Sequence, residues 1–589
     1  MTAREVLSRA DTGLQRTLGR VAWPLTVLGA VLAVVGSFLP WTYDSSFAGD
    51  LTIVGYPGGP QVWVLVLGIV AVLAAVGSGI GNPSRRLSGR GLRGAARAAT
   101  AVVTVLTVVT AAEATKELSG TANIAPGLWL AVAGSVVALV GSRALPGDSP
   151  PELGRRTPAV LGIVGVVVGV AAGLVGAAAL LNIDSADPEL FLDLALFVLG
   201  VVLVLRRLGV AQWYAEQSRR HRTTTLVAVF LAAIAFPFTQ NGSDANMSIA
   251  VQVLVFVAAA LGLNIVIGYA GLLDLGYVAF VGAGAYTSAL LSGSAFAAIG
   301  WSPPFAVTAL IGLLVSAVLG LVIGLPTLRL RGDYLAIVTL AFGEIFRIAV
   351  QNLDGVNGPN LTNGPNGIPS IPAFEWFGFD FDADHTLFGV ELGSFSNYYV
   401  LLLVLIAAIV FVVSRVSESR IGRAWVAIRE DETAAEAMGI NTYRLKILAF
   451  AGGALLAGLG GTIKAHADQA VVPDSYVFQQ SSFLVAAIVL GGMGSIPGVI
   501  LGSTVIILLP EKLRFFSDYR LLLFGLTLIL VMRFRPEGLL PSRRRQLELH
   551  ADEDETDAGP GATLAGDLGP AEGLGRPGPL RPGAEGGIA

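Results

Sequence analysis

The sequence contains no cysteine among its 589 residues. Disulfide bonds, thiolate zinc sites, iron–sulfur clusters and a cysteine nucleophile are therefore excluded. The four histidines lie far apart along the chain and form no HExxH pair, so no histidine pattern indicates a metal site. No glycine is followed by lysine, so the GxxxxGK[ST] loop of a P-loop ATPase is absent as well. We expect this chain to have no catalytic residue and to bind no metal or cofactor.

Charged side chains are also scarce, at 14% of the residues, whereas 54% are hydrophobic. So much apolar surface exceeds what a single soluble core could bury, and we expect lipid to be the main solvent of the chain. The formal net charge is only −4, and the scattered basic residues form no cluster that would bind nucleic acid.

Long apolar runs recur along most of the chain. A membrane-spanning helix needs about 20 apolar residues, and about fourteen runs approach this length. One further run, 482–510, is interrupted by glycines and Pro497, and it either crosses twice or dips into the membrane and returns. The other runs lie near 21–40, 61–80, 97–112, 127–145, 158–182, 189–205, 224–240, 247–267, 276–292, 305–328, 334–351, 398–414, 447–463 and 519–533.

Lysine and arginine near the ends of the runs indicate their orientation, because positive loops stay in the cytoplasm. The stretch between Arg347 and Arg415 contains six acidic residues and no Lys or Arg, so this long loop should lie outside. Arginines crowd the loops 85–93 and 415–429 and the segment 543–545, which should lie inside. We therefore predict a multi-pass protein of the plasma membrane with both termini in the cytoplasm.

The predicted fold is an all-α polytopic bundle of membrane helices in three parts. Residues 1–222 hold six spans that are rich in Ala, Val and Gly and contain few ionisable groups. Residues 223–545 hold the long loops and the polar residues within spans. Residues 546–589 are rich in Gly, Pro, Asp and Glu without apolar periodicity, which predicts a disordered cytoplasmic tail.

A short cytoplasmic helix is predicted at 431–439. Asp431 is a suitable N-cap, and Gly439 suits a C-terminal stop. A helix of about two turns is marginal in water and needs a surface to pack on. A docking peg for a cytosolic partner and a solvated loop helix both remain open at this point. The residues that would dock are Arg429, Glu430, Asp431, Glu432, Ala434, Ala435 and Gly439.

Two glycine-broken apolar stretches, 268–276 and 491–498, lie on either side of this loop. Interrupted segments in corresponding positions of two transporter halves point to a substrate path, although tight helix packing through glycine is the alternative. Among the ionisable residues, Asp274 lies in the first stretch, whereas Glu344 and Arg347 could neutralise each other on one helix. The candidate path residues are Asn264, Gly271, Asp274, Gly276, Gly284, Gly491, Gly492, Gly494, Ser495 and Gly498.

Six ordered stretches between about 225 and 545 resemble the membrane permease subunit of branched-chain amino acid ABC importers of the leucine/isoleucine/valine type. Those richest in motif residues are GYAGLLDLGYVAFVGAGAYTSALL at 268–291, SRIGRAWVAIREDETAAEAMGINTYRLKILAF at 419–450 and LVAAIVLGGMGSIPGVILGS at 484–503. The other three are LRLRGDYLAIVTLAFGEI, LTNGPNGIPSIP and YRLLLFGLTLILVMRFRPEGLLP. The resemblance covers roughly 320 residues and leaves the six spans of 1–222 without a functional account.

This resemblance implies a transport subunit of a bacterial cell membrane that works with several partners. These are a second, related permease, two cytosolic ATPases that use ATP and magnesium, and an extracytoplasmic solute-binding protein. The loop at 429–441 would be the coupling helix that enters a cleft on an ATPase, and closure of the ATPase dimer would switch the path from outward to inward facing. The transported solute would be a branched-chain amino acid or a similar small neutral or zwitterionic molecule. An importer of urea or amides and an ion-coupled secondary carrier are the alternatives.

Overall fold

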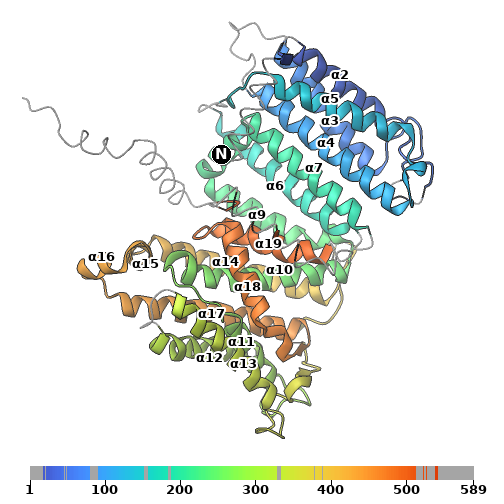
Figure 1. Cartoon of the computed structure of the whole chain (residues 1–589). Helices are drawn as coiled ribbons and strands as arrows, with labels where there is room; N and C mark the ends of the chain where they lie inside the picture. The colour runs from blue at the N-terminus through green and yellow to red at the C-terminus, as the bar shows by residue number, and fades with distance from the viewer. Residues whose placement is uncertain are drawn as a thin grey trace, which may run out of the picture.

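The computed structural model of the chain is almost entirely helical (Figure 1). This confirms the prediction of an all-α polytopic bundle. The run at 519–533 and the tail at 546–589 lie largely or wholly outside the described residues. These residues are 17–19, 21–45, 47, 50–79, 91–151, 157–183, 187–327, 333–373, 375–376, 378–387, 389–512, 522, 525–526, 529, 533 and 538–540.

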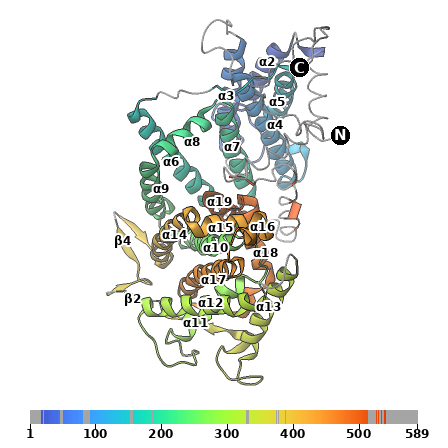
Figure 2. The same cartoon turned by 90° about the vertical axis from the view of Figure 1, so that its left-hand side faces the viewer.

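The N-terminal body contains seven α-helices and one short 3₁₀ turn within the described residues. Helices α2–α5 and α7 pack side by side, and both views show them as one group (Figures 1 and 2). The elements are α2 (Ala22–Gly36), α3 (Gly59–Gly79), α4 (Leu92–Glu117), η1 (Thr121–Asn123), α5 (Pro126–Ala144), α6 (Ala159–Asn182), α7 (Pro188–Arg207) and α8 (Val210–Arg220).

The C-terminal body holds the remaining helices. Its α-helices are α9 (Arg222–Ala235), α10 (Asp244–Leu263), α11 (Val278–Leu290), α12 (Phe305–Thr327), α13 (Asp333–Asn352), α14 (Ser394–Glu418), α15 (Arg420–Glu430), α16 (Glu432–Ala437), α17 (Thr442–Ala467), α18 (Phe478–Gly491) and α19 (Ile496–Lys512). Short helical turns are η2 (Pro237–Gln240), η4 (Gly364–Asn366) and η5 (Pro473–Tyr476), and η3 (Asn264–Tyr269) is a π-helix.

Three two-stranded antiparallel ribbons lie in the long loop after α13 and just after α17. The ribbon of β1 and β6 joins these two regions, which places the loop at the end of the bundle opposite α16. The strands are β1 (Ile368–Pro369) with β6 (Ala470–Val471), β2 (Glu375–Trp376) with β3 (Phe379–Asp380), and β4 (His385–Leu387) with β5 (Val390–Leu392).

Ten helices among the described residues are long and apolar enough to cross a membrane. Helices α2 and α11 occupy predicted spans but are shorter, with 15 and 13 residues. Helix α7 meets the criterion only together with α8, to which it is bent by 82°. The apolar runs therefore located the helices well but overestimated the lengths of α2 and α11.

Helix α17 is the centre of the C-terminal body, where it packs against α10, α11 and α12. The Tyr277 hydroxyl at the start of α11 donates to the carbonyl oxygen of Gly453 over 2.6 Å. Glycine brings the backbones together at the crossing of α11 and α17, since a Cβ on Gly284 would lie 2.0 Å from the oxygen of Gly458. Small residues at such crossings let membrane helices approach closely.

Buried polar contacts join the two bodies. The ammonium of Lys512, which is 2% exposed, donates to the carbonyl oxygens of Leu181 and Ile183 at the end of α6, each over 2.7 Å. Helix α9 packs on both α6 and α14. The last residue of α19 thus caps a helix of the N-terminal body.

A matched pair of glycine substitutions tests this packing. We expect Gly284→Ala to destabilise the protein by about 1–3 kcal/mol, because the added methyl group meets a backbone oxygen. Gly452→Ala in α17 has open space around the new methyl group and should be neutral or stabilising by up to about 1 kcal/mol. Thermal unfolding in detergent measures both, and equal midpoints for the two variants would contradict the contact.

Candidate functional site

Helix α16 forms at the predicted position because both of its ends are capped. The Asp431 side chain accepts hydrogen bonds from the amides of Thr433 and Ala434, over 2.8 and 3.0 Å. At the other end Gly439 has φ +83, and its amide donates to the oxygen of Glu436 over 2.9 Å. The next amide, that of Ile440, donates to Ala435 over 3.1 Å. Together these two bonds form a Schellman motif, which favours glycine at this point.

Two contacts with α17 hold this short helix in place. Lys446, which is 4% exposed, lies 2.5 Å from the Glu432 carboxylate, and the Thr442 hydroxyl donates to Glu436 over 2.7 Å. The Trp425 indole of α15 donates to the oxygen of Leu445 over 2.8 Å. The marginal stability of an isolated short helix is thus offset by tertiary contacts.

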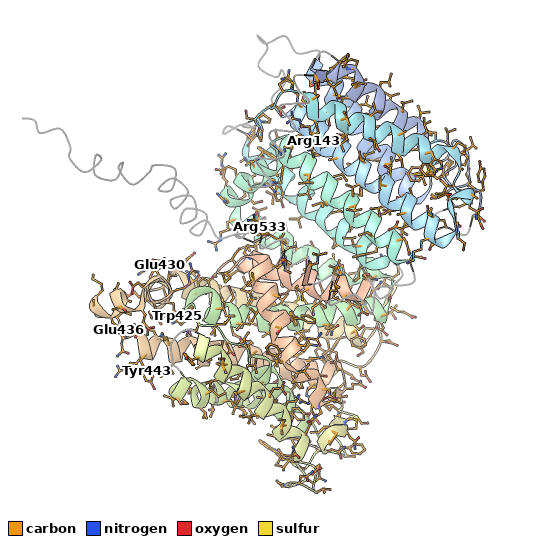
Figure 3. All side chains as sticks on the ribbon, viewed as in Figure 1. Arg143, Trp425, Glu430, Glu436, Tyr443 and Arg533 are labelled. Atoms are coloured by element: carbon orange, nitrogen blue, oxygen red, sulfur yellow. The ribbon has the colours of Figure 1, made fainter. Side chains whose placement is uncertain are left out.

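The outer side of α16 projects away from the rest of the protein (Figures 1 and 3). Thr433, Ala434 and Ala437 are exposed there, and Met438 is 83% exposed. Beside them lies a shallow groove of about 400 Å³, which is lined by Glu436 and by residues 439–443. Figure 3 shows Glu436 and Tyr443 at this projecting end.

The seven predicted docking residues divide into two groups. Glu430, Asp431, Ala434 and Gly439 are exposed. The other three contact the protein itself: Ala435 is 4% exposed, Glu432 pairs with Lys446, and the Arg429 guanidinium donates to the oxygen of Gly268 over 2.8 Å.

Arg429 reaches a point where the two broken stretches meet. The carbonyl of Gly268 that it binds belongs to η3, the π-helix at the end of α10. The Asn264 amide oxygen of the same element accepts a hydrogen bond from the amide of Gly494 over 2.9 Å. Residues separated by more than 200 positions therefore form one polar junction directly behind the α15–α16 loop.

The second broken stretch is a helical hairpin. Helices α18 and α19 fold back on each other, so that a Cβ on Gly502 would lie 2.0 Å from the oxygen of Ala487. Their 14 and 17 residues give lengths of about 21 and 26 Å, which is less than the ~30 Å hydrocarbon thickness. Each helix of this hairpin is therefore shorter than the hydrocarbon layer is thick.

The terminal motif covers the turn of this hairpin. The amides of Leu539 and Leu540 donate to the oxygens of Leu490 and Gly491, over 2.8 and 2.9 Å. These carbonyls belong to the last turn of α18, which would otherwise lack partners. The sequence identifies this motif only through the family resemblance, and it does not indicate that the motif pairs with the carbonyls of α18.

The other path candidates lie at buried contacts or in the turns. Asp274 is 1% exposed, and one of its oxygens accepts from the amide of Gly276 over 2.9 Å, whereas the other finds no hydrogen-bond partner among the described residues. The Ser495 hydroxyl accepts from the amide of Gly498 over 3.2 Å. Gly276, Gly284, Gly491 and Gly498 allow close backbone contacts, and Gly271, Gly492 and Gly494 have positive φ.

One charged group was only half predicted. Arg347 does pair with Glu344, over 3.0 Å, but it also lies 3.7 Å from Asp474 of η5. No spacing rule connects positions so far apart, so the sequence gives no signal for the contact of Arg347 with Asp474.

Comparison with known proteins identifies the family. A family model described as the branched-chain amino acid transport system permease component matches residues 246–532. The permease protein LivM of the high-affinity branched-chain amino acid transport system of Salmonella typhimurium is 40% identical over 340 residues, which cover 56% of this chain and 77% of the relative. The chain belongs to the branched-chain amino acid transport permease family.

Further relatives agree with this assignment. LivM of Escherichia coli K12 is 40% identical over 336 residues, covering 55% of this permease and 76% of the relative. The permease protein LivH of a high-affinity branched-chain amino acid transport system of E. coli K12 is 36% identical over 126 residues, or 21% of this chain and 40% of LivH. No solved structure matches the chain significantly. The permease is therefore a multi-pass membrane transport subunit. The match with the family model, residues 246–532, leaves the N-terminal body outside.

The N-cap of α16 provides a direct test of this site. We expect Asp431→Ala to destabilise α16 by about 1 kcal/mol, which lowers the hydrogen-exchange protection of the Thr433 and Ala434 amides about fivefold. Asp431→Asn retains an oxygen acceptor and should keep most of the protection. Wild-type protection in Asp431→Ala would show that α16 does not depend on this cap.

Proposed function

We propose that this permease forms, with a second related permease, the membrane path of an ABC importer for branched-chain amino acids. Separate cytosolic subunits hydrolyse ATP, and α16 docks into a cleft on one of them. An extracytoplasmic solute-binding protein delivers the solute. Both termini and α16 lie in the cytoplasm, in agreement with the arginine-rich loops.

The observation that carries this proposal is the construction of α16. Helix α16 has only six residues, but caps at both ends and a contact with buried Lys446 make it rigid. Its outer side nevertheless contacts nothing else in the described part of the chain. A projecting, rigid element with small and apolar exposed side chains suits insertion into a cleft of another protein.

The junction behind α16 provides a route for the coupling. When an ATPase moves α16, the Arg429–Gly268 and Asn264–Gly494 hydrogen bonds transmit the displacement to both broken stretches. Packed helices respond to such a displacement by moving as rigid bodies between discrete arrangements. Binding of ATP would then favour one arrangement of the path over the other.

Glu432→Arg is a poor test of docking, because it would place a second cation beside buried Lys446. Met438→Lys changes only an exposed side chain, and Val356→Lys, at 88% exposure on the opposite end, is its matched control. We expect Met438→Lys to reduce the co-purified ATPase at least tenfold while its membrane level stays normal, and Val356→Lys to retain the ATPase. Full retention by a Met438→Lys, Ala434→Arg double variant would refute docking through α16.

The transported solute is tested in liposomes that contain the complete importer. We expect ATP-driven uptake of leucine, isoleucine and valine but not of urea. Uptake of urea in preference to these amino acids would overturn the substrate proposal. Uptake by the permease alone under a sodium or proton gradient would instead identify an ion-coupled carrier.

A further inference from the structure

One side of α13 carries polar residues within a membrane span. Glu344, Arg347 and Gln351 are spaced three and four residues apart, which places them on the same side of the helix. The next side carries exposed apolar residues, including Ile345 at 63% and Ile348 at 49%. Helix α13 thus has an apolar face suited to lipid and, beside it, a charged flank.

The charged side chains of this flank are partly exposed, so they cannot face lipid without a large cost in solvation free energy. The Arg347 and Glu344 side chains are 24% and 33% exposed. Charged residues within membrane spans almost always face the bundle interior, a partner or a water-filled cavity, because hydrocarbon solvates them poorly. We therefore expect this flank to face water or the second permease.

A third charged side chain, that of Asp474 in η5, lies beside this flank. Asp474 is 79% exposed, lies 3.7 Å from the Arg347 guanidinium, and accepts a hydrogen bond from the Gln351 amide over 3.3 Å. The bond from Arg347 to Glu344 is shorter, at 3.0 Å. Because the separation of Arg347 and Asp474 is longer than a good charge-assisted hydrogen bond, a ligand could bridge the two groups at little cost.

A buried hydroxyl beside this group lacks a partner. Tyr286 of α11 is 4% exposed, and its hydroxyl has no hydrogen-bond partner among the described residues. The Tyr286 ring contacts Phe346 of α13 and Tyr476 of η5, with centroids 6.3 and 6.0 Å apart. A polar group that is buried without a partner in a native structure calls for an explanation such as a bound ligand.

We propose that Arg347, Asp474 and Tyr286 form a binding site for the charged groups of a zwitterionic amino acid. This site lies at the end of the path opposite α16. The Arg347 guanidinium binds the solute carboxylate, and Asp474 binds its ammonium group. Glu344 holds the arginine in place, while the Tyr286 hydroxyl gains a polar partner. This inference rests on the proposed function, since it specifies how that solute is received.

The absence of cysteine makes the accessibility of this flank directly measurable. We expect Gln351→Cys to react with a membrane-impermeant, charged methanethiosulfonate reagent in the assembled importer, whereas Ile348→Cys on the apolar face reacts at least tenfold more slowly. The importer with the unmodified chain provides the blank for thiols of the other subunits. Equal rates for the two variants would overturn the proposal.

Protection from the reagent identifies the ligand. We expect leucine to slow the modification of Gln351→Cys, and leucinamide, which lacks the carboxylate, to have little effect. Adding Arg347→Gln should abolish the protection by leucine, and Arg347→Lys should restore part of it. ATP-driven import of leucine without any protection of Gln351→Cys would refute the binding site and leave the proposed function intact. Protection of Gln351→Cys by leucine without ATP-driven import of leucine would support the binding site and refute the proposed function.

Discussion

A helix that is interrupted inside a membrane leaves amide and carbonyl groups that lipid cannot hydrogen-bond. The C-terminal body depends on how these groups are satisfied, because two of its stretches are broken close to each other. Gly268 offers its carbonyl to Arg429, the amide of Gly494 donates to Asn264, and the last turn of α18 accepts from Leu539 and Leu540. Each partner comes from a different part of the chain, so the breaks are stable only within the assembled fold.

This constraint explains why the α15–α16 loop is both projecting and rigid. Arg429 cannot move far without leaving a buried carbonyl unpaired, which typically costs about 1–3 kcal/mol. Lys446 and Glu432 add a second fixed point on α17. These contacts therefore hold the α15–α16 loop firmly against α17 and the first broken stretch.

The same principle extends to the N-terminal body. The buried ammonium of Lys512 binds two carbonyls at the end of α6, and Lys512 is the last residue of α19. The hairpin of α18 and α19 thus contacts the polar junction through its turn and the N-terminal body through its far end. This hairpin therefore links the polar junction to the N-terminal body.

The sequence alone determined the location of the apolar helices, the absence of a P-loop and the two caps of α16, because these properties depend on neighbouring residues. Local patterns also predicted that Glu344 and Arg347 pair, since they lie one turn apart on one helix. Only the tertiary structure decided that Arg429 points inward, that Asp474 joins Arg347, and that Gly276 and Gly284 lie at close backbone contacts. These contacts join residues from distant parts of the chain, and their geometry depends on how whole helices pack, which no spacing within one segment records.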